Sequence, residues 1–131
     1  MTLFRFLLIL LGVTLAGCAS ISSSSFKPID SESKTVFIQP GSMRVLEPIK
    51  KAFRENGWEV NEFDQSKTRY RVHLNTKSTQ IVCLSEWSEL ELELLLLDSK
   101  MQETVFVVEG KSCDSYQNLV DELNKLLKPS V

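Results

Sequence analysis

The strongest constraint on the fold is the run Ser88–Leu97, SELELELLLL, in which leucine alternates with glutamate. In an extended strand successive side chains point to opposite faces. The alternation therefore separates two sets, Leu90, Leu92, Leu94 and Leu96 on one face and Glu89, Glu91 and Glu93 on the other. Such a strand needs a sheet whose leucine face is covered by other elements.

The remaining chain supplies those elements. Short β-rich runs predict four more strands, at 34–40, 58–63, 69–76 and 102–111. Apolar residues at helical spacing predict one helix from about Val45, with Pro48 in its first turn and Gly57 just past its end. A second helix is expected to open at a capping box formed by Asp114 and Gln117. The order β-α-β-β-β-β-α indicates an α+β two-layer sandwich: a mainly antiparallel sheet of four to five strands with two helices on one face.

The first 17 residues have the features of a secretory signal. Arg5 gives a positive start, Phe6–Leu15 is apolar, and small residues follow. The apolar run is shorter than the roughly 20 residues that a membrane-spanning helix needs. Leu15-Ala16-Gly17-Cys18 resembles the lipobox of bacterial lipoproteins. That resemblance implies cleavage before Cys18, a diacylglycerol on its thiol, and an N-acyl chain such as palmitate on its new amino group. The alternative is an ordinary signal peptide with an incidental cysteine.

This interpretation divides the chain into three parts. Residues 1–17 are the signal peptide, residues 18–33 are the lipidated cysteine and a flexible Ser-rich tether, and residues 34–131 are a single periplasmic domain. By the same resemblance, Ala19 and Ser20 lack the aspartate associated with retention in the inner membrane. The expected location is therefore the periplasmic face of the outer membrane, with surface exposure left open.

Two cysteines remain once Cys18 is acylated. Cys83 and Cys113 form an even pair in an oxidising compartment, which predicts one structural disulfide. A redox-active pair is the alternative, but the spacing is far from C-x-x-C.

The sequence contains no motif for catalysis, metal binding or a cofactor, so the protein is predicted not to be an enzyme and to carry no cofactor beyond the acyl chains on Cys18. The single histidine, His73, falls on the polar face of a predicted strand and is expected to be solvated. Arg69 and Arg71 are expected to pair with the three glutamates across strands, and an acidic recognition patch is the alternative. Without residues 1–17, 14 basic side chains face 17 acidic ones because Arg5 is removed from the 15, so nucleic acid is not an expected partner.

The alternation fails at Leu95 and Leu97, which makes both sides of the strand apolar at that end. The next strand adds either Val105 and Val107 or Phe106 and Val108 to the reverse face, depending on hairpin register. Such a patch is typical of a partner surface, and Trp87 belongs either to it or to the core. The alternative is that Phe26 and Ile29 of the tether cover the patch.

These features favour a non-catalytic lipoprotein that is held on the membrane by its lipid anchor and binds another envelope protein, or a second copy of itself as a homodimer. In the arrangement of its elements alone, the domain resembles small α+β lipoproteins that assist envelope assembly, such as the lipopolysaccharide-transport lipoprotein or activators of peptidoglycan synthases. The alternative is a periplasmic inhibitor or ligand-binding lipoprotein, for example a lysozyme inhibitor, in which residues 76–87 form a protruding loop.

Overall fold

A computed structural model describes residues 21–41, 43–84, 88–113 and 116–128. Cys18, Trp87 and Asp114 lie outside these described residues. The elements in chain order are β1 (Ile21–Ser25), β2 (Thr35–Phe37), α2 (Met43–Glu55), β3 (Glu59–Asn61), the short 3-10 helix η2 (Gln65–Lys67), β4 (Tyr70–Val82), β5 (Ser88–Asp98), β6 (Glu103–Ser112) and α3 (Gln117–Leu127).

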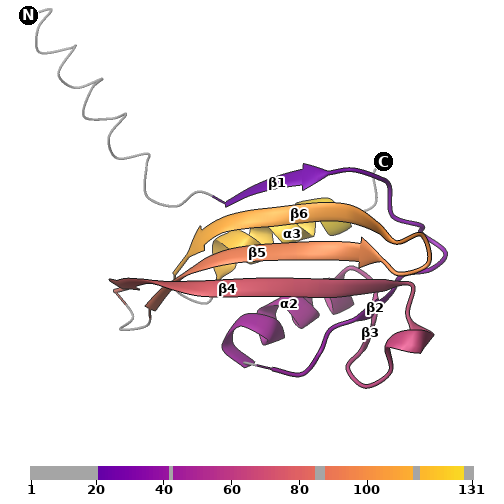
Figure 1. Ribbon diagram of the computed structural model, residues 1–131, viewed down its shortest axis with the longest axis horizontal. Helices are drawn as coiled ribbons and strands as arrows, with labels where there is room; N and C mark the ends of the chain where they lie inside the picture. The colour runs from indigo at the N-terminus through magenta and orange to yellow at the C-terminus, as the bar shows by residue number, and fades with distance from the viewer. Residues whose placement is uncertain (1–20, 42, 85–87, 114–115, 129–131) are drawn as a thin grey trace, which may run out of the picture.

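The strands form one sheet in the order β1-β6-β5-β4-β2-β3, and both helices lie on the same side of it (Figure 1). Helix α3 packs against β1 and β6, and α2 packs against β3 and α3. The core lies between these two layers. It includes the leucine face of β5 together with apolar side chains of both helices, among them Leu92, Leu94, Leu96, Ile49, Phe53, Leu119 and Leu123. The predicted α+β sandwich with two helices on one face is confirmed, with six strands in the sheet.

The sheet is antiparallel from β1 through β6 and β5 to β4, whereas β2 runs parallel to both β3 and β4. The helix between β2 and β3 explains the parallel pair. A chain that leaves a strand, crosses the sheet as a helix and returns beside that strand does so in the same direction. The sheet is therefore mixed, with its longest strands antiparallel.

The prediction of a flexible tether at residues 18–33 is wrong for residues 21–33, which the structure describes. Residues 21–25 form β1, which pairs antiparallel with β6, and Ser23 Oγ donates a 2.6 Å hydrogen bond to Glu122 of α3. Further along, Asp30 N donates to the Tyr70 hydroxyl at 2.9 Å, and Ile29 packs against the core. Strand pairing uses backbone groups, so a serine-rich segment can occupy the edge of a sheet without an apolar pattern.

The C-terminal end of α2 has the cap that the sequence predicts. Gly57 has φ of 83°, in the left-handed region that favours glycine, and Trp58 N donates back to the Phe53 carbonyl at 3.0 Å. The Trp58 ring then meets the Phe53 ring edge-on, with centroids 5.1 Å apart. The start of α2 differs from the expectation, because the helix begins at Met43 and Pro48 lies inside it.

A bulge between β5 and β6 places Val105 on a different face from the reverse face, where Val105 and Val107 were one of the two predicted pairs. Leu96 faces Phe106, but the next residue, Leu97, faces Thr104, so Val105 has no opposite residue. An extra residue in one strand turns the side chains beyond it to the other face. As a result Val105 and Phe106 are both buried, and Val105 belongs to the core rather than to the reverse face of the sheet.

Cys83 and Cys113 form the predicted disulfide, with Cα atoms 5.8 Å apart. Cys83 directly follows β4, and Cys113 directly follows β6. Since β5 lies between these strands in the sheet, the bond joins the strands on both sides of β5 at one end.

Removal of this disulfide will lower the stability of the domain. Cys83→Ser should reduce the free energy of unfolding by about 3–4 kcal/mol, because the bond closes a loop of 30 residues in the unfolded chain. Denaturant unfolding of the two single variants and the double variant measures this. The double variant should be no less stable than either single one, and additive losses would contradict a shared bond.

Candidate interaction surface

The face of the sheet opposite the helices is the candidate interaction surface. Its side chains come from alternate positions of β4, β5, β6 and β1, and the strand register arranges them in four rows. From one end of the sheet to the other these rows are Arg71-Leu97-Thr104, His73-Leu95-Val107-Ser24, Asn75-Glu93-Glu109-Ser22 and Lys77-Glu91-Lys111.

The first two rows form the apolar end of this surface. Leu95, Leu97 and Val107 are each only partly buried and are separate from the main core cluster. We call these three residues the apolar patch. The structure therefore places three of the predicted site residues together, on the face that the helices leave uncovered.

Of the two tether residues that could cover the patch, Phe26 lies beside the strand that carries Val107, because its N–H donates to the Val105 carbonyl of β6 at 2.8 Å. Ile29 packs against the main core, and Phe26 keeps 65% of its surface exposed. With the side chain of Phe26 this exposed, Leu95, Leu97 and Val107 stay only partly buried.

The other two rows are charged and polar. The register places Glu91 between Lys77 on β4 and Lys111 on β6. Asn75 Nδ2 donates to Glu93 Oε1 at 3.1 Å, while the residue facing Glu93 on β6 is Glu109. Two carboxylates directly opposite on neighbouring strands repel each other. The row that contains Glu93 and Glu109 therefore suits a partner that brings a positive charge, while the next row toward the hairpin carries Lys77 and Lys111.

The expected pairing of Arg69 and Arg71 with the glutamates is wrong. Arg71 lies opposite Leu97 in the ladder, and the side chain of Arg69 binds Asp98 and Asp30. The reason is register: the glutamates occupy the first half of β5, and the arginines stand opposite its last residues.

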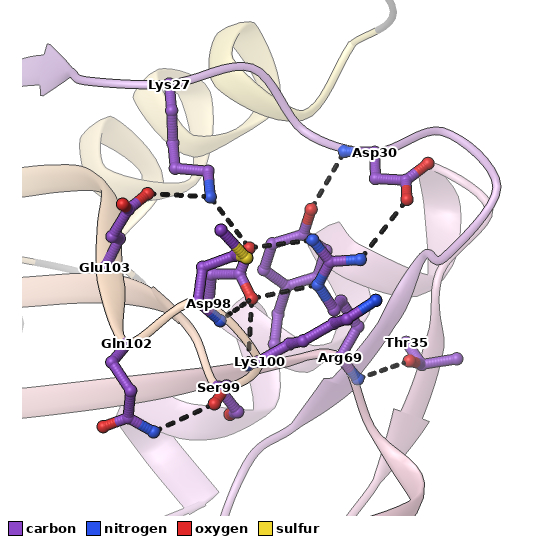
Figure 2. A network of polar contacts seen from close by, with 11 residues as sticks. Lys27, Asp30, Thr35, Arg69, Asp98, Ser99, Lys100, Gln102 and Glu103 are labelled. Atoms are coloured by element: carbon purple, nitrogen blue, oxygen red, sulfur yellow. Dashed lines mark hydrogen bonds and ion pairs between the residues drawn. The ribbon is translucent and has the colours of Figure 1, made fainter.

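Asp98, at the end of β5, is the centre of the most extensive buried ion-pair network among the described residues (Figure 2). Its side chain is fully buried. Arg69 donates to it through two nitrogens, at 2.9 and 3.0 Å, and Lys27 Nζ donates at 2.9 Å. The backbone N–H groups of Lys100 and Met101 complete its shell at 3.0 and 3.2 Å.

The network also holds its own basic residues in place. Lys27 makes a second ion pair with Glu103 at 3.1 Å, and Arg69 reaches Asp30 at 3.4 Å. Three segments meet at Asp98: the chain between β1 and β2, the start of β4, and the turn between β5 and β6 (Figure 2).

These contacts shift the pKa values of the network in the directions that favour charge. Hydrogen bonds from Arg69, and then from Lys27, hold the pKa of the Asp98 carboxyl well below its usual range. The same bond from Arg69 raises the pKa of the guanidinium, and Asp98 followed by Glu103 raises the pKa of Lys27. A strongly perturbed carboxylate often marks a catalytic site. Here, however, five donors occupy its two oxygens, which is the arrangement of a structural ion pair.

His73 lies on the exposed reverse face of β4, opposite Leu95. The described residues contain no cluster of three or more His, Cys, Asp or Glu side chains that could hold a metal ion. Within the same ranges, no helix is long and apolar enough to cross a membrane.

In the segment 76–87, expected as a protruding irregular loop, residues 76–82 are strand, and residues 85–87 lie outside the described residues. Residues 76–82 continue β4 and pair with the start of β5, with a register shift between Ser78 and Val82. The exposed apolar side chains at the end of this hairpin, Ile81, Val82 and Leu84, are not among the functional residues that the sequence predicts. A signal was present, since residues 78–84 contain no charged residue.

No protein-family model and no curated protein sequence matches the chain. Among solved structures, it is similar to the PelC dodecamer from Paraburkholderia phytofirmans, with a TM-score of 0.57 and 11% identity over 85% of this chain and 96% of that one. A point variant of the same dodecamer gives a TM-score of 0.56 at the same identity and coverage. A minor lipoprotein from Acinetobacter baumannii aligns with a TM-score of 0.32 and 10% identity over 73% of this chain and 87% of that one. At these identities the PelC likeness concerns the fold alone.

Substitution of Asp98 will test the network. Asp98→Asn should lower the free energy of unfolding at pH 7 by roughly 2–4 kcal/mol, because Arg69 and Lys27 lose a buried partner. The pKa of Asp98 is lowered by folding, so the charged network contributes in full above the unfolded value of about 3.9 and is lost as pH falls below it. The gap between wild type and variant should therefore narrow below about pH 4.

Denaturant unfolding across this pH range measures the effect. Glu103→Gln is the matched control, because Glu103 shares Lys27 but is 55% exposed, and it should cost less than about 1 kcal/mol. A loss for Asp98→Asn that is equally small, or that is independent of pH, would contradict the structural role.

Proposed function

We propose that the protein is a non-catalytic lipoprotein, anchored by Cys18 on the periplasmic face of the outer membrane, that binds another envelope protein through the helix-free face of its sheet. The observation that carries this proposal is the apolar patch, Leu95, Leu97 and Val107. It is partly exposed on a face where the other residues of the four rows are polar.

The patch supports binding because exposed apolar side chains that lie together gain free energy when a partner removes them from water. The surface around the patch is not uniformly apolar. Arg71 and His73 border it on β4, and Glu93 and Glu109 follow it along the sheet. A partner that matches this surface has an apolar centre and a basic group about two to four residues away along the strands.

The hydrogen bonding of the buried Asp98 carboxylate favours binding over catalysis as the function. The oxygens of Asp98 are occupied by five donors, and such a carboxylate is a poor proton acceptor for a substrate. A lipid anchor would give a binding module an advantage of its own. Confinement to a membrane raises its effective concentration near partners on the same membrane.

A second copy of the chain is the other partner to consider, because the PelC structures of similar fold are described as dodecamers. The chain offers the same uncovered sheet face on each copy. Native mass spectrometry of the acylated protein in detergent separates the two cases: monomers support a different envelope protein as partner, and a defined oligomer supports self-assembly.

The anchor is tested by Cys18→Ser. The variant should lose all acyl chains and move from the membrane fraction to the soluble fraction, or accumulate as uncleaved precursor. Intact-mass measurement and membrane fractionation read this out. Cys83→Ser, which removes a different cysteine, should remain acylated and membrane-bound, and a Cys18→Ser variant that matures and fractionates normally would refute the anchor.

The patch is tested by charged substitutions. In the native envelope, Leu95→Glu combined with Leu97→Glu should reduce crosslinking to the captured partner at least tenfold, which corresponds to about 1.4 kcal/mol of binding free energy. Phe63→Glu is the matched control, because Phe63 is 91% exposed and lies outside the patch. Unchanged capture by a stably folded double variant would remove the patch from the proposal.

A further inference from the structure

The end of the β4–β5 hairpin exposes three apolar side chains. Ile81, Val82 and Leu84 keep 56%, 68% and 102% of their surfaces exposed. They lie in a stretch, residues 78–84, that contains no charged side chain. We call Ile81, Val82 and Leu84 the hairpin tip. Exposed apolar side chains gathered at one point of a small domain are typical of an interaction site.

The tip is held at the end of the sheet by covalent and polar contacts. Cys83, between Val82 and Leu84, is bonded to Cys113 at the end of β6. Thr79 Oγ1 donates to Glu89 Oε1 across the hairpin at 3.0 Å, and Gln80 takes a left-handed conformation with φ of 66° where the ladder shifts register. These contacts fix the apolar residues at the end of the strands and support the hairpin from both sides of β5.

The tip lies at the same end of the sheet as the start of β1. Ile21 faces Gly110 of β6, Gly110 faces Leu92 of β5, and Leu92 faces Thr76 of β4. From this row the hairpin continues outward to Val82, which faces Ser88. Figure 1 shows β1 beginning at the end of the molecule where β4 finishes.

The chain before β1 is too short to carry Cys18 beyond the tip. The three residues from Cys18 to Ile21 can span at most about 10 Å. Along β5 the four residues from Leu92 to Ser88 extend about 13 Å at roughly 3.3 Å per residue. An acylated Cys18 therefore places the membrane surface within reach of Val82 and Leu84.

We propose that the hairpin tip enters the interfacial region of the bilayer beside the acylated Cys18. This inference rests on the acylation of Cys18 under the proposed function. The tip is a second membrane contact, and its uncharged apolar side chains gain free energy when they are buried at the boundary between headgroups and acyl chains. Lys77 and Lys111 are exposed a short distance behind it, at the level where lipid phosphates lie.

A second contact would set the orientation of the domain. The acyl chains alone leave the domain free to turn about its short connection, whereas two contacts at one end of the sheet hold the strands upright on the membrane. The apolar patch then stands away from the bilayer, because Leu95 and Leu97 lie seven and nine residues along β5 from Ser88, or about 23–30 Å. Partners anchored on the same membrane could approach it from the side.

Photocrosslinking with the full-length, acylated protein tests this. Benzoylphenylalanine replaces Leu84 in one sample and Phe63 in the other, and each protein is reconstituted in vesicles of phosphatidylethanolamine and phosphatidylglycerol. Phe63 is the matched control because it is 91% exposed and follows β3, whose last residue is aligned with Phe37 and Arg71 at the opposite end of the sheet. After irradiation, mass spectrometry should show at least ten times more phospholipid adduct at position 84 than at position 63.

Further readouts separate this inference from the proposed anchor. Intact mass before irradiation reports whether Cys18 carries acyl chains, and a protein without them would overturn the anchor and this inference together. In the acylated protein, equal lipid adducts at positions 84 and 63, or adducts at 84 to protein alone, would overturn the inference and leave the anchor standing. With the probe at position 81, Leu84→Asp should reduce the lipid adduct severalfold, and an unchanged yield would also count against insertion.

Discussion

The carboxylate of Asp98 is the contact on which the arrangement of three otherwise separate segments depends. It lies at the end of β5 with no exposed surface, and Arg69 and Lys27 reach it from two different parts of the chain. A buried charge is costly unless it is paired and hydrogen-bonded, so the position of each donor is closely constrained. Lys27 links the network to the segment after β1. The serine-rich edge strand is thus joined to the rest of the sheet by an ion pair as well as by its ladder.

The sequence was informative wherever the pattern of its side chains determines the local structure. The alternation in Ser88–Leu97, the two amphipathic helices and the cysteine pair all led to features that the structure contains. These signals are strong because burial selects the side chains directly. Gly57 belongs with them, since its left-handed backbone is a local requirement.

The sequence was uninformative where the structure depends on backbone hydrogen bonds or on contacts between residues far apart in the chain. β1 consists of Ile21 and four serines, and it pairs with β6 through main-chain bonds that leave no pattern in the side chains. Val105 was ambiguous because the bulge opposite Leu96 and Leu97 depends on the register of two strands together. Asp98 closes a Leu/Glu strand and resembles an ordinary turn residue, and only the fold brings Arg69 and Lys27 to it. The sequence predicts the candidate surface at Leu95, Leu97 and Val107. Which charged side chains lie next to one another in its other half depends on the strand register, which the sequence does not show.

The reverse face of the sheet changes from polar to apolar along its strands, and a purely structural role does not explain this change. Side chains that face water on a one-sided sheet are usually polar along their whole length. Here β5 changes from glutamate at positions 89–93 to leucine at 95 and 97, and β6 provides Val107 beside Leu95. The main core does not need these side chains, since the helices and the other face of the sheet already form it. Under the proposed function, a contact with a further molecule gives the apolar half a role, and the repulsion between Glu93 and Glu109 gives that contact a preferred charge. Under the proposed function, the surface is one side of an interface whose other side is apolar at its centre and basic opposite Glu93 and Glu109.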